Sequence, residues 1–211
     1  MAAIIGRVFW EGLLADLAGV PIDPELRSLE ERAFIESLGP AELNDDWEWA
    51  FRHMLVHEVA YSSMLRSVRR EAHLRVAAWL EPHAEERRGE YAPLLAYHYE
   101  RAENWEKAAA YAEEAGNRAA QLYAHREAST SYRQAVDALA LLPSEPATQR
   151  RQIEITLKLA KVYLDSPIDV MPALETAKSL AEQIGDDALT QRVASATTGL
   201  LWTNYSRKGF S

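Results

Sequence analysis

Two histidines four residues apart, His53 and His57, form the first pair of side chains in this chain that could share a chemical task. On a helix, this spacing places both imidazoles on one face, where they could ligate a metal ion. The metalloprotease pattern His-Glu-x-x-His is not completed, because no histidine follows His57-Glu58 at the required distance. The chain also has no cysteine, so no thiolate ligand is available. The sequence therefore predicts no metal site.

Patterns for other kinds of catalysis are also missing from the sequence. There is no cysteine nucleophile and no Gly-x-Ser-x-Gly turn that would present a serine. None of the five lysines follows a glycine, so the chain has no P-loop to hold a triphosphate. We expect no catalytic residue and no cofactor in this chain.

A basic helix face is expected from Arg66, Arg69 and Arg70. Three interpretations fit it: contact with DNA, an intramolecular or phosphate-facing role, or a solvated surface. The net charge of −9 argues against non-specific nucleic-acid binding, because neutralising phosphates needs clustered Lys and Arg. Nucleic acid is therefore not the expected partner.

Aromatic side chains recur at helical spacing in the middle of the chain, among them Tyr97, Tyr99, Trp105 and Tyr132. They could line a groove for a partner. The same spacing is more typical of aromatic packing between paired helices, which is the interpretation that we favour.

The elements that carry these residues are mostly helices. Apolar residues recur with helical period over residues 65–80, 105–123 and 153–164. Strand alternation is confined to Trp47–Phe51, which predicts one short hairpin or wing. We expect a mostly all-α fold of about ten helices: a small winged-helix-like domain over residues 1–83, then an array of helical repeats over 84–211.

The second part has the pattern of tetratricopeptide-like helix pairs. Gly116 takes the glycine position of a repeat, and Ala128, Tyr132 and Ala135 take the positions of its second helix. Small residues at these points allow two helix axes to approach closely. The Gly209-Phe210 pair near the end is typical of the start of a further helix, so we expect a fragment of a longer array.

No apolar run approaches the roughly 18 residues of a membrane span, and no signal peptide is evident at the N-terminus. The sequence predicts a cytoplasmic location and no membrane partner.

Several strings together resemble the region that follows the ATPase core in bacterial STAND-type signalling ATPases, over essentially the whole chain. The most specific string begins at Phe51 with Phe-Arg-His-Met-Leu and continues with Glu-Val-Ala-Tyr to Tyr61; the others are Ile4–Trp10, Leu29–Ile35, Arg70–His73, Leu95–Tyr99 and Trp105–Ala109. The resemblance is greatest to the versions fused to class III adenylate or guanylate cyclase domains. LuxR-type transcriptional regulators carry a similar module.

The resemblance implies a regulatory arm without catalysis of its own. Its partners would be an upstream nucleotide-binding domain in cis, which would hold ATP or ADP with Mg²⁺, and a protein or small effector on the repeats. His53, with Arg52 beside it, occupies the place of a histidine that contacts the β-phosphate of ADP in related NB-ARC ATPases. The alternative for His53 is that it caps or packs the junction between hairpin and helix. For the whole chain, the alternatives are a free-standing repeat adaptor, a part of a LuxR-type transcriptional regulator, and a DNA-binding winged helix.

Overall fold

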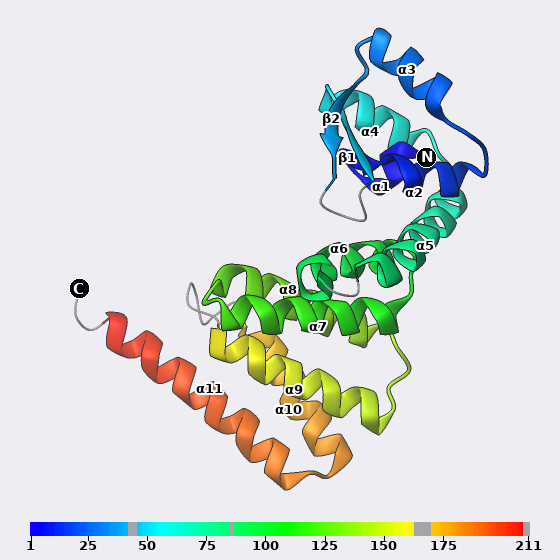
Figure 1. The fold of residues 1–211 in the computed structure, drawn as a ribbon. Coiled ribbons are helices and arrows are strands. Elements are labelled where there is room, and N and C mark those ends of the chain that lie inside the picture. The colour runs from blue at the N-terminus through cyan, green and yellow to red at the C-terminus, as the bar shows by residue number, and fades with distance from the viewer. Residues whose placement is uncertain (42–45, 85–86, 163–169, 209–211) are drawn as a thin grey trace. The chain divides into compact units, whose positions relative to one another are not determined.

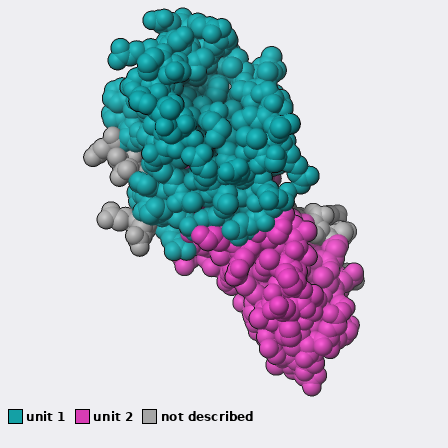
Figure 2. Space-filling model, turned by 90° about the vertical axis from the view of Figure 1, so that its right-hand side faces the viewer, with its two compact units in different colours: residues 1–91, 97–104 teal, residues 92–96, 105–211 magenta. Residues whose placement is uncertain are grey.

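The computed structural model describes residues 1–41, 46–84, 87–162 and 170–208, and this part of the chain is mostly helical with one small sheet (Figure 1). The mostly all-α prediction is therefore confirmed. The chain divides into two compact units, coloured separately in Figure 2: unit 1 comprises residues 1–91 and 97–104, and unit 2 comprises 92–96 and 105–211. Helix α6 (Arg88–Arg101) contributes residues to both. The sequence prediction placed the boundary earlier, near residue 84.

Unit 1 combines short helices with a three-stranded sheet. Its other elements are α1 (Ala2–Ile5), β1 (Val8–Trp10), α2 (Glu11–Ala18), α3 (Asp23–Glu31), β2 (Ile35–Pro40), β3 (Trp47–Phe51), α4 (Met54–Ser62) and α5 (Arg66–His83).

The sheet is antiparallel with the order β1-β3-β2. The predicted strand over Trp47–Phe51 is confirmed as the central strand β3. Its neighbours β1 and β2 were not predicted. Strand β1 has only three residues, too few to show an alternation, and β2 is irregular, with a register shift between Ser37 and Gly39.

The core of unit 1 forms between the sheet and the helices. Phe9 of β1 and Phe51 of β3 pack together with ring centroids 5.5 Å apart. Helix α5 buries Val76, Ala77 and Leu80 completely. The contact of Phe51 with Phe9 anchors the end of β3, three residues before α4 begins at Met54.

Unit 2 continues with α7 (Trp105–Gln121), α8 (His125–Ala140), α9 (Pro146–Val162), α10 (Met171–Ile184) and α11 (Asp187–Lys208), and each helix packs on the next (Figure 1). The helical segment predicted over residues 105–123 is confirmed up to residue 121 in α7, and the one over 153–164 is confirmed up to residue 162 in α9, because residues 163 and 164 lie outside the described residues. Helix α9 also contacts α11. Residues 209 and 210, which the repeat argument used, lie outside the described residues.

The pair α7 and α8 meets where the sequence predicts small residues. A Cβ added to Gly116 would lie 2.6 Å from two ring carbons of Tyr132, so only glycine fits against this ring. Tyr132 is buried and its hydroxyl donates a hydrogen bond to Asn117 Oδ1 at 3.0 Å. Ala112 and Ala128 are also fully buried.

Within the described residues, no helix is both long and apolar enough to cross a membrane.

Candidate functional site

Helix α4 of unit 1 is unusually exposed, because none of its residues is buried. Leu55 is 69% exposed and Val59 is 59% exposed. Being four residues apart, they lie on one face of the helix. Met54 on α4, and Leu65 and Val68 further along the chain, are exposed as well. An exposed apolar pair on one helix face, such as Leu55 and Val59, is a candidate interaction surface.

The inner side of α4 is held by aromatic contacts. The ring of His57 lies edge-on to Phe51 at 5.3 Å and is stacked with Tyr61 at 6.3 Å. Both ring nitrogens of His57 are buried without a hydrogen-bond partner in the described part of the chain. His57 therefore packs inward, while His53 is exposed at the start of the helix. Among the described residues, no group of three or more His, Cys, Asp or Glu side chains could hold a metal ion.

His53 occupies the N-cap position of α4 with an extended backbone, but its side chain makes no capping hydrogen bond. Its main-chain oxygen accepts hydrogen bonds from the amides of Val56 and His57. The His53 side chain therefore does not cap this junction through a hydrogen bond. The imidazole lies at the surface, where a partner could reach it.

Arg52 is half-exposed, and its guanidinium lies 3.7 Å from the carboxylate of Glu36 on β2. Its main-chain amide donates to the oxygen of Phe34 at 3.1 Å. Arg52 and His53 thus connect the end of the central strand β3 to the start of α4. Any contact with a phosphate by Arg52 would compete with Glu36.

A buried histidine pair lies behind α4. His73 of α5 and His98 of α6 face each other, with their Nδ1 atoms 2.9 Å apart. The hydroxyl of Tyr61 lies 3.1 Å from Nε2 of His73, so the network continues to α4. A distance of 2.9 Å between two ring nitrogens requires that only one of them carries a proton at that position.

The surroundings of the pair disfavour a positive charge. Burial lowers the pKa of His73 to about 4, and the charges of Arg101 and Arg69 act in the same direction. The pKa of His98 is lowered to about 3, first by burial and then by the neighbouring His73, while a hydrogen bond with the main chain at Ile5 acts in the opposite direction. Both rings are therefore neutral at pH 7, and they serve as a packed hydrogen-bonding pair.

The predicted basic face is largely neutralised within unit 1. Arg66 and Arg70 donate to the two carboxylate oxygens of Glu103, at 2.7 and 3.1 Å. Arg69 lies over the ring of Tyr61 at 4.9 Å and donates to its main-chain oxygen. Of the three interpretations, the intramolecular role accounts for all of these contacts.

The predicted partner groove is not formed by the aromatic residues proposed for it. Tyr99 and Tyr132 are buried in the core, so they cannot line an open groove. Burial raises the pKa of Tyr99, as does its contact with Glu81. Tyr97 is partly exposed, with Arg101 over its ring at 5.4 Å, and Trp105 is half-buried at the start of α7. Packing between helices is the role observed for Tyr99 and Tyr132.

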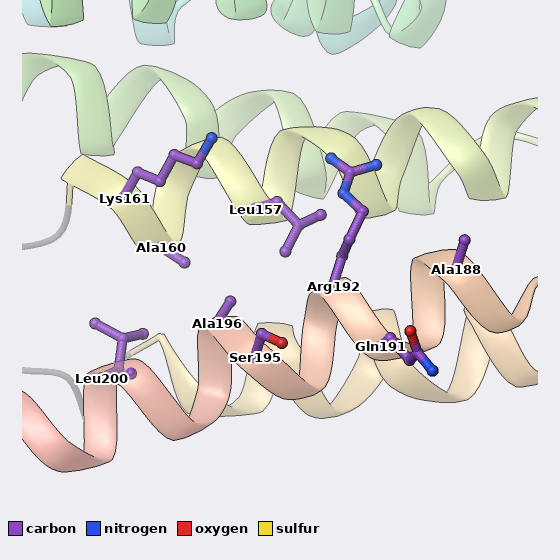
Figure 3. Close-up of a pocket in the computed structure, with 10 residues that line it drawn as sticks. Leu157, Ala160, Lys161, Ala188, Gln191, Arg192, Ser195, Ala196 and Leu200 are labelled. Carbon is purple, nitrogen blue, oxygen red and sulfur yellow. The ribbon is translucent and has the colours of Figure 1, made fainter.

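A groove does exist in unit 2, between α9 and α11, with a volume of about 790 Å³. Leu157 and Ala160 of α9 point across it towards Ala196 of α11 (Figure 3). Apart from Leu200, the other residues that line it are small or polar: Lys161, Ala188, Gln191, Arg192, Ser195 and Gly199. The groove could not be predicted from the sequence, because the residues that face each other across it, such as Leu157 and Arg192, are distant in the chain.

Comparison of the chain with models of protein families, with curated proteins and with solved structures gives no match.

Proposed function

We propose that this chain is a non-catalytic regulatory arm of a STAND-type signal-transduction ATPase. In this proposal, unit 1 docks on a nucleotide-binding domain of the same protein, and unit 2 receives an effector or protein partner. The output domain would be an adenylate or guanylate cyclase. The resemblance described above motivates the proposal, and the exposed face of α4 is the observation that carries it.

The exposed face of α4 supports docking for an energetic reason. A nine-residue helix is too short to be stable alone in water and depends on packing for its stability. Leaving Leu55 and Val59 in water forgoes about 1.5–3 kcal/mol for each side chain that a partner would bury. A docked domain would recover this free energy and would cover the string on which the resemblance is strongest.

His53 is the side chain that we propose for nucleotide sensing. It is exposed at the start of α4, so a domain docked on Leu55 would also meet its imidazole. An imidazole N–H can donate to a phosphate oxygen, and the bond is stronger when the ring is protonated. Loss of this contact on nucleotide exchange would shift the balance between docked and released states.

The first test is the DNA sequence on both sides of this reading frame. An in-frame Gly-x-x-x-x-Gly-Lys-Ser/Thr within about 300 codons upstream supports the proposal. Stop codons directly before Met1 and after Ser211 would refute it.

The second test uses the continuous protein and measures basal output activity. We expect His53→Ala to raise it, because the ADP-bound state loses a stabilising contact. His83→Ala is the matched control, since His83 is also an exposed histidine of unit 1 but lies at the end of α5. Equal basal activity of His53→Ala and the unchanged protein would refute the role of His53.

The groove between α9 and α11 favours a second candidate, a free-standing adaptor that binds protein partners. Its small residues would let a partner helix approach closely, and the exposed side chains Leu201 and Trp202 continue the same helix. The observation that separates the two candidates is the presence or absence of the upstream P-loop.

A further inference from the structure

A second cavity, of about 410 Å³, lies in unit 1 away from α4. Helix α3 provides Asp23, Leu26, Arg27 and Glu30, strands β2 and β3 provide Ser37, Trp47 and Trp49, and α2 provides Glu11. Three parts of the chain that are distant in sequence thus meet at one opening. Nothing in the resemblance or in the proposed function uses this cavity.

Two indole rings form the aromatic part of the cavity. Trp49 is nearly buried, whereas Trp47 is 44% exposed. The N–H of Trp47 donates to Oγ of Ser37 at 2.7 Å, and the N–H of Trp49 donates to Glu11 at 2.8 Å. Each indole ring is therefore held in place by the hydrogen bond of its N–H group. A ligand entering the cavity would meet carbon rings, whose faces attract cations.

Three carboxylates, on Glu11, Asp23 and Glu30, stand against one guanidinium, on Arg27. Within the described residues, neither Asp23 nor Glu30 forms an ion pair, and Arg27 is not paired with either of them although all three are on α3. The cavity therefore has an excess of negative charge that no ion pair among the described residues neutralises. It would repel phosphates and carboxylates.

We propose that this cavity binds an organic cation with an apolar stem. Its alkyl part would lie against Trp47 and Trp49, and its ammonium or guanidinium group would reach Asp23 and Glu30. A free polyamine and a Lys or Arg side chain of a partner share this chemistry. The site is independent of the docking role of α4, so either one can fail without the other.

The test is a titration of the whole chain at low salt with two probes, spermidine and Nα-acetyl-lysine methylamide. Binding is measured from the heat released and from tryptophan fluorescence. The fluorescence should respond because Trp47 lines the site. We expect saturable binding with one site per chain. Glu30→Gln and Asp23→Asn should each weaken it by about two- to fivefold, as for a partly exposed ion pair. Trp47→Ala should weaken it by about threefold or more.

Two further variants separate a site from general attraction to an acidic chain. Glu31→Gln removes the same charge from the same helix but lies outside the cavity, so it should leave binding nearly unchanged. Arg27→Gln removes the competing cation and should tighten binding. Circular dichroism and the urea midpoint establish that each variant is folded.

The two probes distinguish the sources of the cation. We compare the affinities of the two probes after allowing for the larger number of positive charges on spermidine. A remaining preference for spermidine indicates a free polyamine as the ligand. No remaining preference indicates a Lys or Arg side chain of a partner. Absence of saturable binding with both probes would overturn the proposal. Equal weakening by Glu31→Gln and Glu30→Gln would overturn it as well, as would unchanged binding in folded Trp47→Ala.

Discussion

Acidification between pH 7 and pH 5 should destabilise unit 1 through the His73–His98 pair. Both imidazoles are almost completely buried and their pKa values are lowered to about 4 and about 3. In the unfolded chain each would have the ordinary pKa near 6.5. In this pH range the unfolded state therefore binds protons that the folded state excludes. The free energy of unfolding must decrease as the pH falls below 6.5, and the decrease ends as the pH passes the folded pKa values.

The size of the effect follows from proton linkage. With two more protons bound by the unfolded state, the slope approaches about 2.7 kcal/mol per pH unit. Between pH 7 and pH 5 the loss amounts to about 4 kcal/mol for the pair. This is a large part of the roughly 5–15 kcal/mol that stabilises a typical domain.

Urea unfolding of the chain at pH 7, 6 and 5 measures this loss, with fluorescence reporting on the tryptophans of unit 1. The double variant His73→Gln, His98→Leu removes both titrating rings, while the glutamine keeps a partner for the hydroxyl of Tyr61. We expect it to be less stable at pH 7 but to lose almost no stability between pH 7 and pH 5. His53→Gln is the control and should keep the slope of the unchanged chain, because His53 is exposed.

Equal free energies of unfolding of the unchanged chain at pH 7 and pH 5 would refute this prediction. So would a double variant whose free energy of unfolding depends on pH as steeply as that of the unchanged chain. Carboxylates do not obscure the result: Glu103 and Glu154 have pKa values lowered mainly by hydrogen bonds from Arg66 and Arg192, respectively. Their stabilisation is complete above the ordinary glutamate pKa near 4.5 and is lost below it, outside the range measured.

Two substitutions in unit 2 test how its helices pack. Gly116→Ala should lower the free energy of unfolding by about 1–3 kcal/mol, because the new methyl group collides with the ring of Tyr132. Gly199→Ala should instead stabilise α11 by up to about 1 kcal/mol, because the added Cβ has open space around it. Equal effects of the two substitutions in urea unfolding would contradict the packing described. Burial raises the pKa of Glu113, but Lys158 and Arg151 outweigh it and hold this pKa below its usual value. Glu113→Gln should therefore destabilise the chain at pH 7 but much less at pH 3.5. A loss of unfolding free energy that does not change with pH would contradict this account.

The helix pair α7 and α8 could be predicted because its determinants are local. The alanines of α7 recur at helical spacing, and the sequence predicts a close helix crossing at Gly116 and Tyr132. Side-chain size alone then indicates where the helices approach. The structure confirms this at the contact of Gly116 with Tyr132.

The histidine pair and the tryptophan-lined cavity could not be predicted in this way. His73 and His98 are 25 positions apart, and neither has a neighbour in sequence that indicates a partner. The cavity depends on strand β2, whose irregular register hides the alternation typical of a strand. Trp47 and Trp49 were recognised as strand residues, but the residues of α3 opposite them could not be placed from sequence.

For His53, sequence and structure lead to a more specific conclusion together than either does alone. The sequence offers two roles for this residue. Its side chain makes no cap hydrogen bond and is exposed, and the role in nucleotide sensing stays a prediction. Arg66 and Arg70 are weaker candidates for contact with a partner, because both guanidinium groups already pair with Glu103. Exposure without an internal partner is therefore the criterion that separates candidate contacts from structural ones.

The two proposed surfaces of unit 1 should respond to salt in opposite ways. Docking through Leu55 and Val59 buries apolar area, which added salt does not weaken. Binding of a cation near Asp23 and Glu30 depends on exposed charges, which salt screens over about 10 Å at 0.1 M and about 3 Å at 1 M. A partner that is released at high salt would therefore bind through the tryptophan-lined cavity, whereas one that is retained would bind through α4.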